Sequence, residues 1–192
     1  MRRMVFGSIA IVGLVVASTA AAQGPQAMVF ELRPLAGLLL PVGEMRDDFA
    51  TAPLFGLQAG FELNTNAHIV LGGTFARADA RFPSFTQART NIWQFDTGAE
   101  VNLVRAMGES WLFRPFVGVG LGARTYDYTM PGEPARTCAA GYGALGAELQ
   151  RHAVAVRFED RNTLSCFTSP ETDARRTRFD VGLALALVYH VM

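Results

Sequence analysis

Residues 177–191 alternate between two kinds of side chain. Every second residue is large and apolar: Phe179, Val181, Leu183, Leu185, Leu187, Tyr189 and Val191. The residues between them start with charge and continue as mostly small ones: Arg178, Asp180, Gly182, Ala184, Ala186, Val188 and His190. A helix would spread the apolar residues around its circumference, whereas a strand places the two sets on opposite faces. The alternation therefore predicts a β-strand with one wholly apolar face.

The same division recurs in other segments, and glycine goes with the charged residues. In residues 90–105, the face with Asp96 and Glu100 also carries Gly98, opposite Trp93 and Phe95. The interior of a small barrel has little room, so small residues must sit beside large ones there. A solvated outer face has no reason to prefer glycine, which weakens strands. The charged face is therefore predicted to point into a barrel, and the apolar face to point outward into lipid.

Eight strands are expected along the chain, with ends uncertain by a few residues. They lie near 28–41, 53–63, 67–79, 90–105, 111–126, 139–149, 153–163 and 177–191. The gaps NTNA, AMGES and QRH are short, whereas VGEMRDDFAT, ARFPSFTQAR, DYTMPGEPART and SCFTSPETDARR are long. This alternation predicts an all-β fold, an eight-stranded antiparallel up-and-down transmembrane β-barrel with short periplasmic turns and longer extracellular loops. A soluble lipocalin-like barrel with the two faces reversed is the alternative.

The first 22 residues have the pattern of a secretory signal peptide. Arg2 and Arg3 precede the apolar run MVFGSIAIVGLVVAS, and small residues in STAAAQ predict cleavage after Ala22. The apolar run is shorter than the ~20 residues of a spanning helix. Residues 23–192 are then expected to form a single barrel domain in the outer membrane of a Gram-negative-type bacterium.

Three internal segments carry a resemblance to a known family. They are RPFVGVGLGA, GYGALGAEL and AVRFEDRN, and a final strand running to the C-terminus follows them. With this pattern the chain resembles the small eight-stranded outer-membrane β-barrel family, which includes the OmpA membrane domain, OmpX and Ail. The resemblance covers nearly all of residues 23–192. It implies a monomer that contacts outer-membrane lipid and the outer-membrane assembly machinery, although this chain ends in Met where such barrels commonly end in Phe.

The face assignment predicts an ion-pair network inside the barrel. Thirteen charged residues should point inward: Glu31, Arg33, Glu62, Asp96, Glu100, Arg114, Arg124, Glu148, Arg157, Glu159, Arg161, Arg178 and Asp180. Buried charges are tolerated when they are paired and hydrogen-bonded, and arginine and carboxylate groups pair well. The expected result is a plugged interior, with a narrow gated pore as the alternative.

Several functional classes find little support in the sequence. The chain has 17 cationic and 17 acidic residues, so no basic excess points to nucleic acid. His68, His152 and His190 are the candidates for a catalytic base, but none has a Ser and a carboxylate at a convincing neighbouring position. We expect them to be interfacial or turn residues. The three His and two Cys show no metal-ligand spacing, and no cofactor is expected.

Cys138 and Cys166 are the only cysteines and lie about equally far from the short turn near Arg151. We expect them at the same height on a hairpin, joined by a disulfide bond in an oxidising compartment. One detail opposes regular pairing. If Glu148 and Arg157 both point inward, the two cysteines face opposite sides of the sheet unless a β-bulge intervenes or the pairing has ended.

The sequence therefore predicts a non-enzymatic barrel with a structural or surface-interaction role, acting through its outer loops. Segments such as MPGEPART and SPETDARR are polar and turn-rich, and loops on a rigid scaffold often carry recognition. An extracellular ligand is possible, but the sequence does not identify it. A lipid A modifying outer-membrane enzyme and a small-solute pore remain the alternatives.

Overall fold

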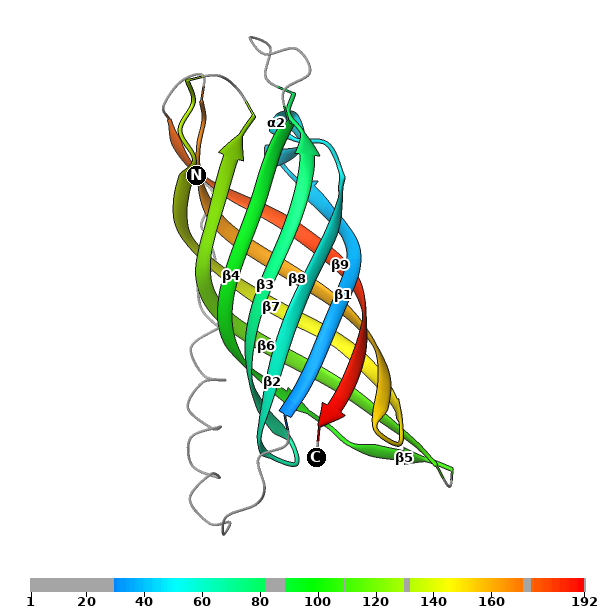
Figure 1. The fold of residues 1–192 in the computed structure, drawn as a ribbon. Helices are drawn as coiled ribbons and strands as arrows, with labels where there is room; N and C mark the ends of the chain where they lie inside the picture. Colours follow the sequence, from blue (N-terminus) through cyan, green and yellow to red (C-terminus); the bar gives the residue numbers. More distant parts are fainter. Residues whose placement is uncertain (1–29, 82–88, 109, 130–131, 171–173, 192) are drawn as a thin grey trace, which may run out of the picture.

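The computed structural model describes residues 30–81, 89–108, 110–129, 132–170 and 174–191. Its eight long strands form one sheet that closes on itself (Figure 1). They are β1 (Phe30–Val42), β2 (Ala52–Asn64), β3 (Ala67–Asp79), β4 (Arg89–Asn102), β6 (Trp111–Tyr128), β7 (Arg136–Arg151), β8 (Val154–Thr168) and β9 (Arg175–Val191). Each long strand pairs antiparallel with the next along the chain, and β1 pairs with β9. The predicted eight-stranded up-and-down barrel is confirmed.

Two short elements complete the described fold. Strand β5 (Arg105–Met107) pairs with the beginning of β6, so this hairpin extends beyond the barrel wall. Helix α2 (Met45–Asp48) lies in the connection between β1 and β2. The sequence predicts a loop for this connection. It also predicts a single strand over residues 90–105, whereas in the structure β4 ends at Asn102 and β5 begins at Arg105. No helix among the described residues is long and apolar enough to cross a bilayer.

The barrel has two distinct ends (Figure 1). The end that holds the last residues of β9 also holds the start of β1, the β5 hairpin and the turns at 65–66 and 152–153. Helix α2 lies at the other end, which we call the α2 end. In the turn at 152–153, His152 has a φ of 58°, the left-handed conformation that closes the turn. Which end faces outward in a cell stays a prediction.

Burial follows the two-residue alternation of the sequence. The outward side chains Phe95, Leu121 and Leu185 are 64%, 72% and 60% exposed, whereas the inward Asp96 and Ala184 are buried. Glycines create the space that large inward groups need. A Cβ atom at Gly98 or Gly120 would overlap the side chain of Tyr142. The absence of side chains at these two positions therefore leaves room for the Tyr142 ring inside the barrel. This is the pairing of small with large residues that the sequence predicted.

The interior has an apolar layer at the α2 end and a charged layer below it. Met45, the first residue of α2, and Phe49, which directly follows the helix, are buried in the apolar layer. The ring of Phe49 stacks on Tyr126 at 6.0 Å between centroids and meets Phe167 edge-on at 5.5 Å. The connection between β1 and β2 therefore folds back into the mouth of the barrel instead of extending from it.

The predicted signal peptide and its cleavage site lie outside the described residues.

Candidate functional site

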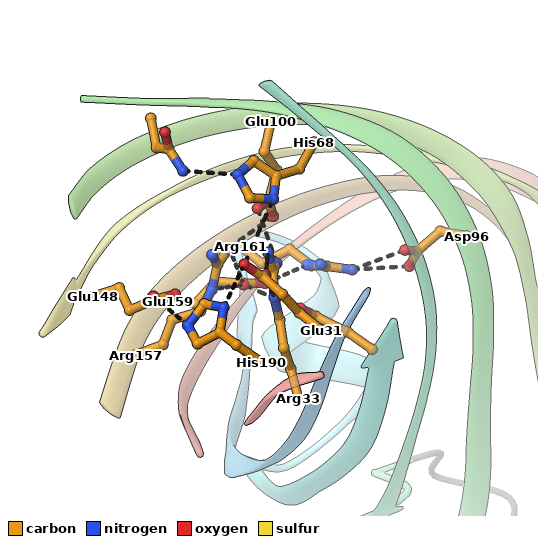
Figure 2. Close-up of polar contacts among 12 residues, drawn as sticks. Glu31, Arg33, His68, Asp96, Glu100, Glu148, Arg157, Glu159, Arg161 and His190 are labelled. Atoms are coloured by element: carbon orange, nitrogen blue, oxygen red, sulfur yellow. Dashed lines mark hydrogen bonds and ion pairs between the residues drawn. The ribbon is translucent and has the colours of Figure 1, made fainter. Parts of the chain in front are cut away.

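The charged layer is centred on Arg33 of β1 (Figure 2). Its Nη1 donates to Oε2 of Glu100 at 2.9 Å, and its Nη2 donates to Oε2 of Glu31 at 2.5 Å. Glu31 and Arg33 are two residues apart on one strand, so both point inward, whereas Glu100 comes from β4. Arg33 is only 1% exposed and bridges two carboxylates across the barrel.

Strand β8 supplies the other half of this network. Arg157 donates to Oε1 of Glu100 at 2.7 Å and to Oε2 of Glu159 at 3.0 Å. Arg161 donates from Nε to Oε1 of Glu159 at 2.8 Å and from Nη1 to Oδ2 of Asp96 at 2.9 Å. Three residues at a two-residue spacing on β8 therefore link the two acidic residues of β4. Arginine and carboxylate groups alternate through the whole chain of contacts (Figure 2).

Two histidines join the network at the end opposite α2. Nδ1 of His190 lies 3.1 Å from Oε1 of Glu31, and its Nε2 lies 3.6 Å from Oε1 of Glu148 (Figure 2). His68 lies 3.7 Å from the same Glu31 oxygen, and its Nε2 is 3.0 Å from Nδ2 of Asn102. Both histidines are buried, so the expectation of interfacial or turn positions is wrong for them, while the exposed His152 does lie in a turn.

Charge counting gives these histidines a reason to be inside. This end of the interior holds five buried carboxylates, Glu31, Asp96, Glu100, Glu148 and Glu159, and three buried arginines, Arg33, Arg157 and Arg161. A buried carboxylate without a partner is costly. Within the described residues Glu148 forms no ion pair with an arginine, although Arg114 and Arg157 are in register with it, and His190 lies 3.6 Å from it. The histidines therefore contact buried carboxylates that outnumber the buried arginines in this layer.

A second cluster connects the network to the apolar layer. Arg124 of β6 forms an ion pair with Asp180 of β9 and donates from Nε to Oε1 of Gln94 at 2.9 Å. Nε2 of Gln94 in turn donates to Oδ2 of Asp96 at 2.8 Å. The hydrogen-bonded chain therefore runs without a break from Glu31 to Asp180.

At the α2 end, Arg178 holds the folded-back connection in place. It donates to Oε2 of Glu44 at 2.7 Å and forms an ion pair with Asp48, so it contacts the residues at both ends of α2. Its guanidinium also lies 5.3 Å from the centroid of the Phe167 ring. Partial burial raises the pKa of the Asp48 carboxyl, and the Arg178 charge opposes that rise. This set is called the mouth latch below: Glu44, Asp48 and Arg178.

The structure places eleven of the thirteen predicted inward residues in the buried interior. Glu62 and Arg114 are half-buried, and both lie near the end opposite α2. Sequence analysis missed His68, His190 and Gln94 as network members, although His190 and Gln94 belong to the same alternating sets as Asp180 and Asp96. It also missed Glu44 and Asp48, because nothing in a polar loop indicates that it folds into a barrel.

Little space is left inside. One interior cavity among the described residues has a volume of about 20 Å³, between Gln58, Gln94, Arg124 and Arg161 among others. That is room for about one water molecule.

The two buried histidines contact acidic and amide groups. In the described residues, the polar contacts of His68 and His190 are with Glu31, Asn102 and Glu148, and none is with a hydroxyl or thiol. A hydroxyl nucleophile would need such a contact to lose its proton. No group of three His, Cys, Asp or Glu side chains in the described part of the chain is arranged to hold a metal ion.

The predicted disulfide bond is not present in the structure, where Cys138 and Cys166 are free. The strand register gives the reason. Glu148 pairs with Arg157, so Cys166 is opposite Ala139 and faces away from the side on which Cys138 lies. The two cysteines are nevertheless neighbours, since the Cys138 thiol donates to the Cys166 carbonyl oxygen. Side chains that point to opposite sides of a sheet cannot be bridged without backbone movement.

No protein-family model matches the chain. No curated protein sequence matches it either. Solved structures do match. Neisserial surface protein A, NspA, is 9% identical with a TM-score of 0.64, and the alignment covers 85% of this chain and 99% of NspA.

Two further structures extend the comparison. The N-terminal β-barrel domain of Pseudomonas aeruginosa OprF is 12% identical with a TM-score of 0.50, covering 84% of this chain and 97% of that domain. Ail, the attachment invasion locus protein of Yersinia pestis, is 13% identical with a TM-score of 0.43, covering 86% of this chain and 99% of Ail. The alignments with NspA and the OprF domain show that the fold is that of the small outer-membrane β-barrels. The resemblance found in the sequence is thereby confirmed at the level of the fold.

Proposed function

We propose that this chain is a non-enzymatic outer-membrane β-barrel with a closed lumen, and that it acts as a structural or surface-interaction protein. The observation that carries the proposal is the filled interior. The charged network occupies one end, and Met45, Phe49 and the mouth latch occupy the other. What remains for interaction with a ligand is the outer rim, formed by the connections at the α2 end.

The outer surface supports a place in the membrane. Outward residues from Phe179 to Tyr189 on β9 are all apolar or aromatic, and these two residues are ten positions apart. Ten residues of strand span ~33 Å. A strand tilt of about 40° reduces that to ~25 Å, the height of the apolar band on outer-membrane barrels. Such a band exposed to water would promote aggregation.

The apolar outer surface also indicates which partners the barrel would contact. Membrane lipid would cover the apolar band, and the outer-membrane assembly machinery would insert a monomeric barrel. One compared structure is named as a surface protein, NspA, which is consistent with a role at the cell surface. The chemistry of an extracellular ligand is not defined by the described residues.

The two alternatives are weaker. A small-solute pore needs a continuous path, whereas buried charged side chains and a cavity of only about 20 Å³ occupy the described interior. A lipid A modifying enzyme needs a nucleophile beside a base, and the buried histidines contact carboxylates and an amide instead.

The proposal is tested first by location. The full chain expressed in a Gram-negative host should fractionate with the outer membrane, begin at Gln23 by mass spectrometry, and migrate faster unheated than boiled, because a closed barrel resists detergent. A soluble periplasmic chain without this heat-dependent shift would overturn it.

The closed lumen and the absence of catalysis are tested separately. Purified barrel in planar bilayers should give no discrete conductance steps, and lipid A from expressing cells should have an unchanged mass. Conductance steps would establish the pore. A lipid A mass change that is lost in His68→Ala or His190→Ala would establish the enzyme.

A further inference from the structure

The outer wall carries a hollow of about 690 Å³ across β2, β3 and β4. Its floor includes Gly73, an outward residue of β3 without a side chain, and the ring of Phe95 leans toward it, 3.2 Å from where a Cβ atom would lie. Leu57 and Phe95 pair with Gly73 from the two neighbouring strands and form the sides. Leu71 and Phe75, two residues before and after Gly73, close its two ends. The hollow is therefore a pit in an apolar part of the outer surface, on the strands β2 to β4 and away from the outward polar residues Asp160 and Asn162 of β8.

The aromatic edge of this pit points to its depth in the membrane. Phe75 pairs with Trp93, with 4.4 Å between ring centroids, on the side of the pit nearer the α2 end. Tryptophan is enriched at the level of lipid headgroups. The pit thus opens just below that level, where the upper part of an acyl chain lies.

A cation lies directly beyond the aromatic edge. Arg77 has an exposed side chain on the outward face, four residues beyond Gly73, or ~13 Å along the strand. Its neighbours Asp79 and Arg89 pair with each other at 3.3 Å. Arg77 itself forms no ion pair with another described residue, so its charge is available to an anion at headgroup level.

We propose that this pit and Arg77 form a seat for one phosphate-bearing membrane lipid, with an acyl chain packed over Gly73 and the phosphate on Arg77. The inference rests on the proposed membrane location. Empty volume in an apolar surface loses dispersion contacts, and in a bilayer an acyl chain is the group at hand to restore them. Arginine binds phosphate with two parallel hydrogen bonds, which fixes one headgroup at the edge of the pit.

Native mass spectrometry of the detergent-purified full chain tests the seat. Phosphatidylglycerol or lipid A is titrated, and diacylglycerol with the same acyl chains serves as the lipid without phosphate. Wild type should saturate at one bound lipid. Gly73→Leu should weaken binding of every lipid by roughly tenfold, because the new side chain fills the pit. Arg77→Gln should weaken the phosphate lipids only. An equal loss of diacylglycerol and phosphate-lipid binding in Arg77→Gln would overturn the phosphate contact.

Matched controls separate the seat from general lipid adhesion. Gly143 is an outward glycine of β7 whose added Cβ would meet nothing within 4 Å, so Gly143→Leu should bind lipid as wild type does. Arg105→Gln removes an exposed arginine at the other end of the barrel and should also have no effect. Wild-type binding by Gly73→Leu, or equal losses in Gly143→Leu, would overturn the seat.

The failure of this inference differs from the failure of the proposed function. Each variant is first checked for the heat-dependent gel shift. A chain that never forms a detergent-stable barrel contradicts the membrane proposal itself. A stable barrel that binds lipid without dependence on Gly73 and Arg77 contradicts the seat alone.

Discussion

At the scale of single residues, the interior depends on side chains that satisfy more than one partner. Glu100 accepts from Arg33 and Arg157 with different oxygens, and Glu159 does the same for Arg157 and Arg161. Removing one member therefore leaves two buried groups without their partner. Breaking a buried pair from one side costs much more than an exposed pair contributes.

Arg33→Met should lower the free energy of unfolding by ~3 to 5 kcal/mol, because Glu31 and Glu100 both lose a buried partner. Urea unfolding in lipid vesicles, followed by tryptophan fluorescence, measures the change. Arg105→Met, at an exposed position of β5, is the control and should change stability by less than ~0.5 kcal/mol. Equal effects of the two variants would contradict the network.

The sequence predicts the arginines and carboxylates of the charged layer, but not its histidines. Alternation and the sharing of one face by glycine and charge were enough to place Arg33, Glu100 and Arg157 inside. The same alternation put His190 with Asp180, but a histidine near a strand end reads equally well as an interfacial residue. Its role depends on a surplus of buried carboxylates from four strands, and that is known only once the register is fixed.

At the scale of elements, the strands act through register. A shift of one residue would turn every side chain of a strand to the other face. The outward positions of β9 therefore differ from one another only in depth. Leu185 lies near mid-strand and Tyr189 near the end, and both are more than half exposed.

Leu185→Arg should destabilise the barrel by ~2 to 4 kcal/mol, whereas Tyr189→Arg should cost about 0 to 1 kcal/mol, because the cost of a charge falls from the bilayer midplane to the interface. The same vesicle unfolding assay compares them. If both variants lost equal stability, depth in a membrane would not be the cause.

Register also governs the cysteines. The pairing of Glu148 with Arg157 sets Ala139 opposite Cys166, both on the outward face. A chain with Cys138→Ala and Ala139→Cys should form a disulfide bond on mild oxidation. The native chain, denatured without reduction, should label at two thiols per molecule. Blocked thiols in the native monomer, released by reduction, would mean that the rim pairs one residue out of the register seen here.

The burial of the connection that contains α2 could not be predicted from its local sequence. VGEMRDDFAT is polar and charged, and this composition is typical of a solvated loop. Met45 and Phe49 become buried only because Tyr126 and Phe167 line the mouth they enter. An apolar residue in a loop is common, so the sequence alone could not indicate a plug.

At the scale of the molecule, side chains fill the described interior at two levels in series, and we propose that both act as barriers. The mouth is held by the apolar packing of Phe49 and by the mouth latch, and the far end by the charged network. The latch is also the more accessible barrier, since Glu44 is largely exposed and Asp48 only partly buried. Opening at the mouth should therefore require less free energy than opening at the network.

Arg178→Gln should increase the rate of tryptic cleavage after Arg46 several-fold, because cleavage needs the connection to leave the mouth. Mass spectrometry of the fragments identifies the site. Arg176→Gln is the matched control, because Arg176 is exposed and its ion pair with Glu44 is long, at 3.9 Å. Cleavage at equal rates in both variants would show that Arg178 does not hold α2 in place.

The pairing of β1 with β9 has a consequence for the order of the chain. Phe30 is opposite Val191, so the first and last strands meet side by side and the cylinder has no seam distinct from its other strand pairs. A short linker from residue 191 to residue 30, with new ends opened at 152–153, should give a circular permutant with the same barrel. The cyclic order of neighbouring strands would then determine the barrel, and the position of the chain ends along that order would not.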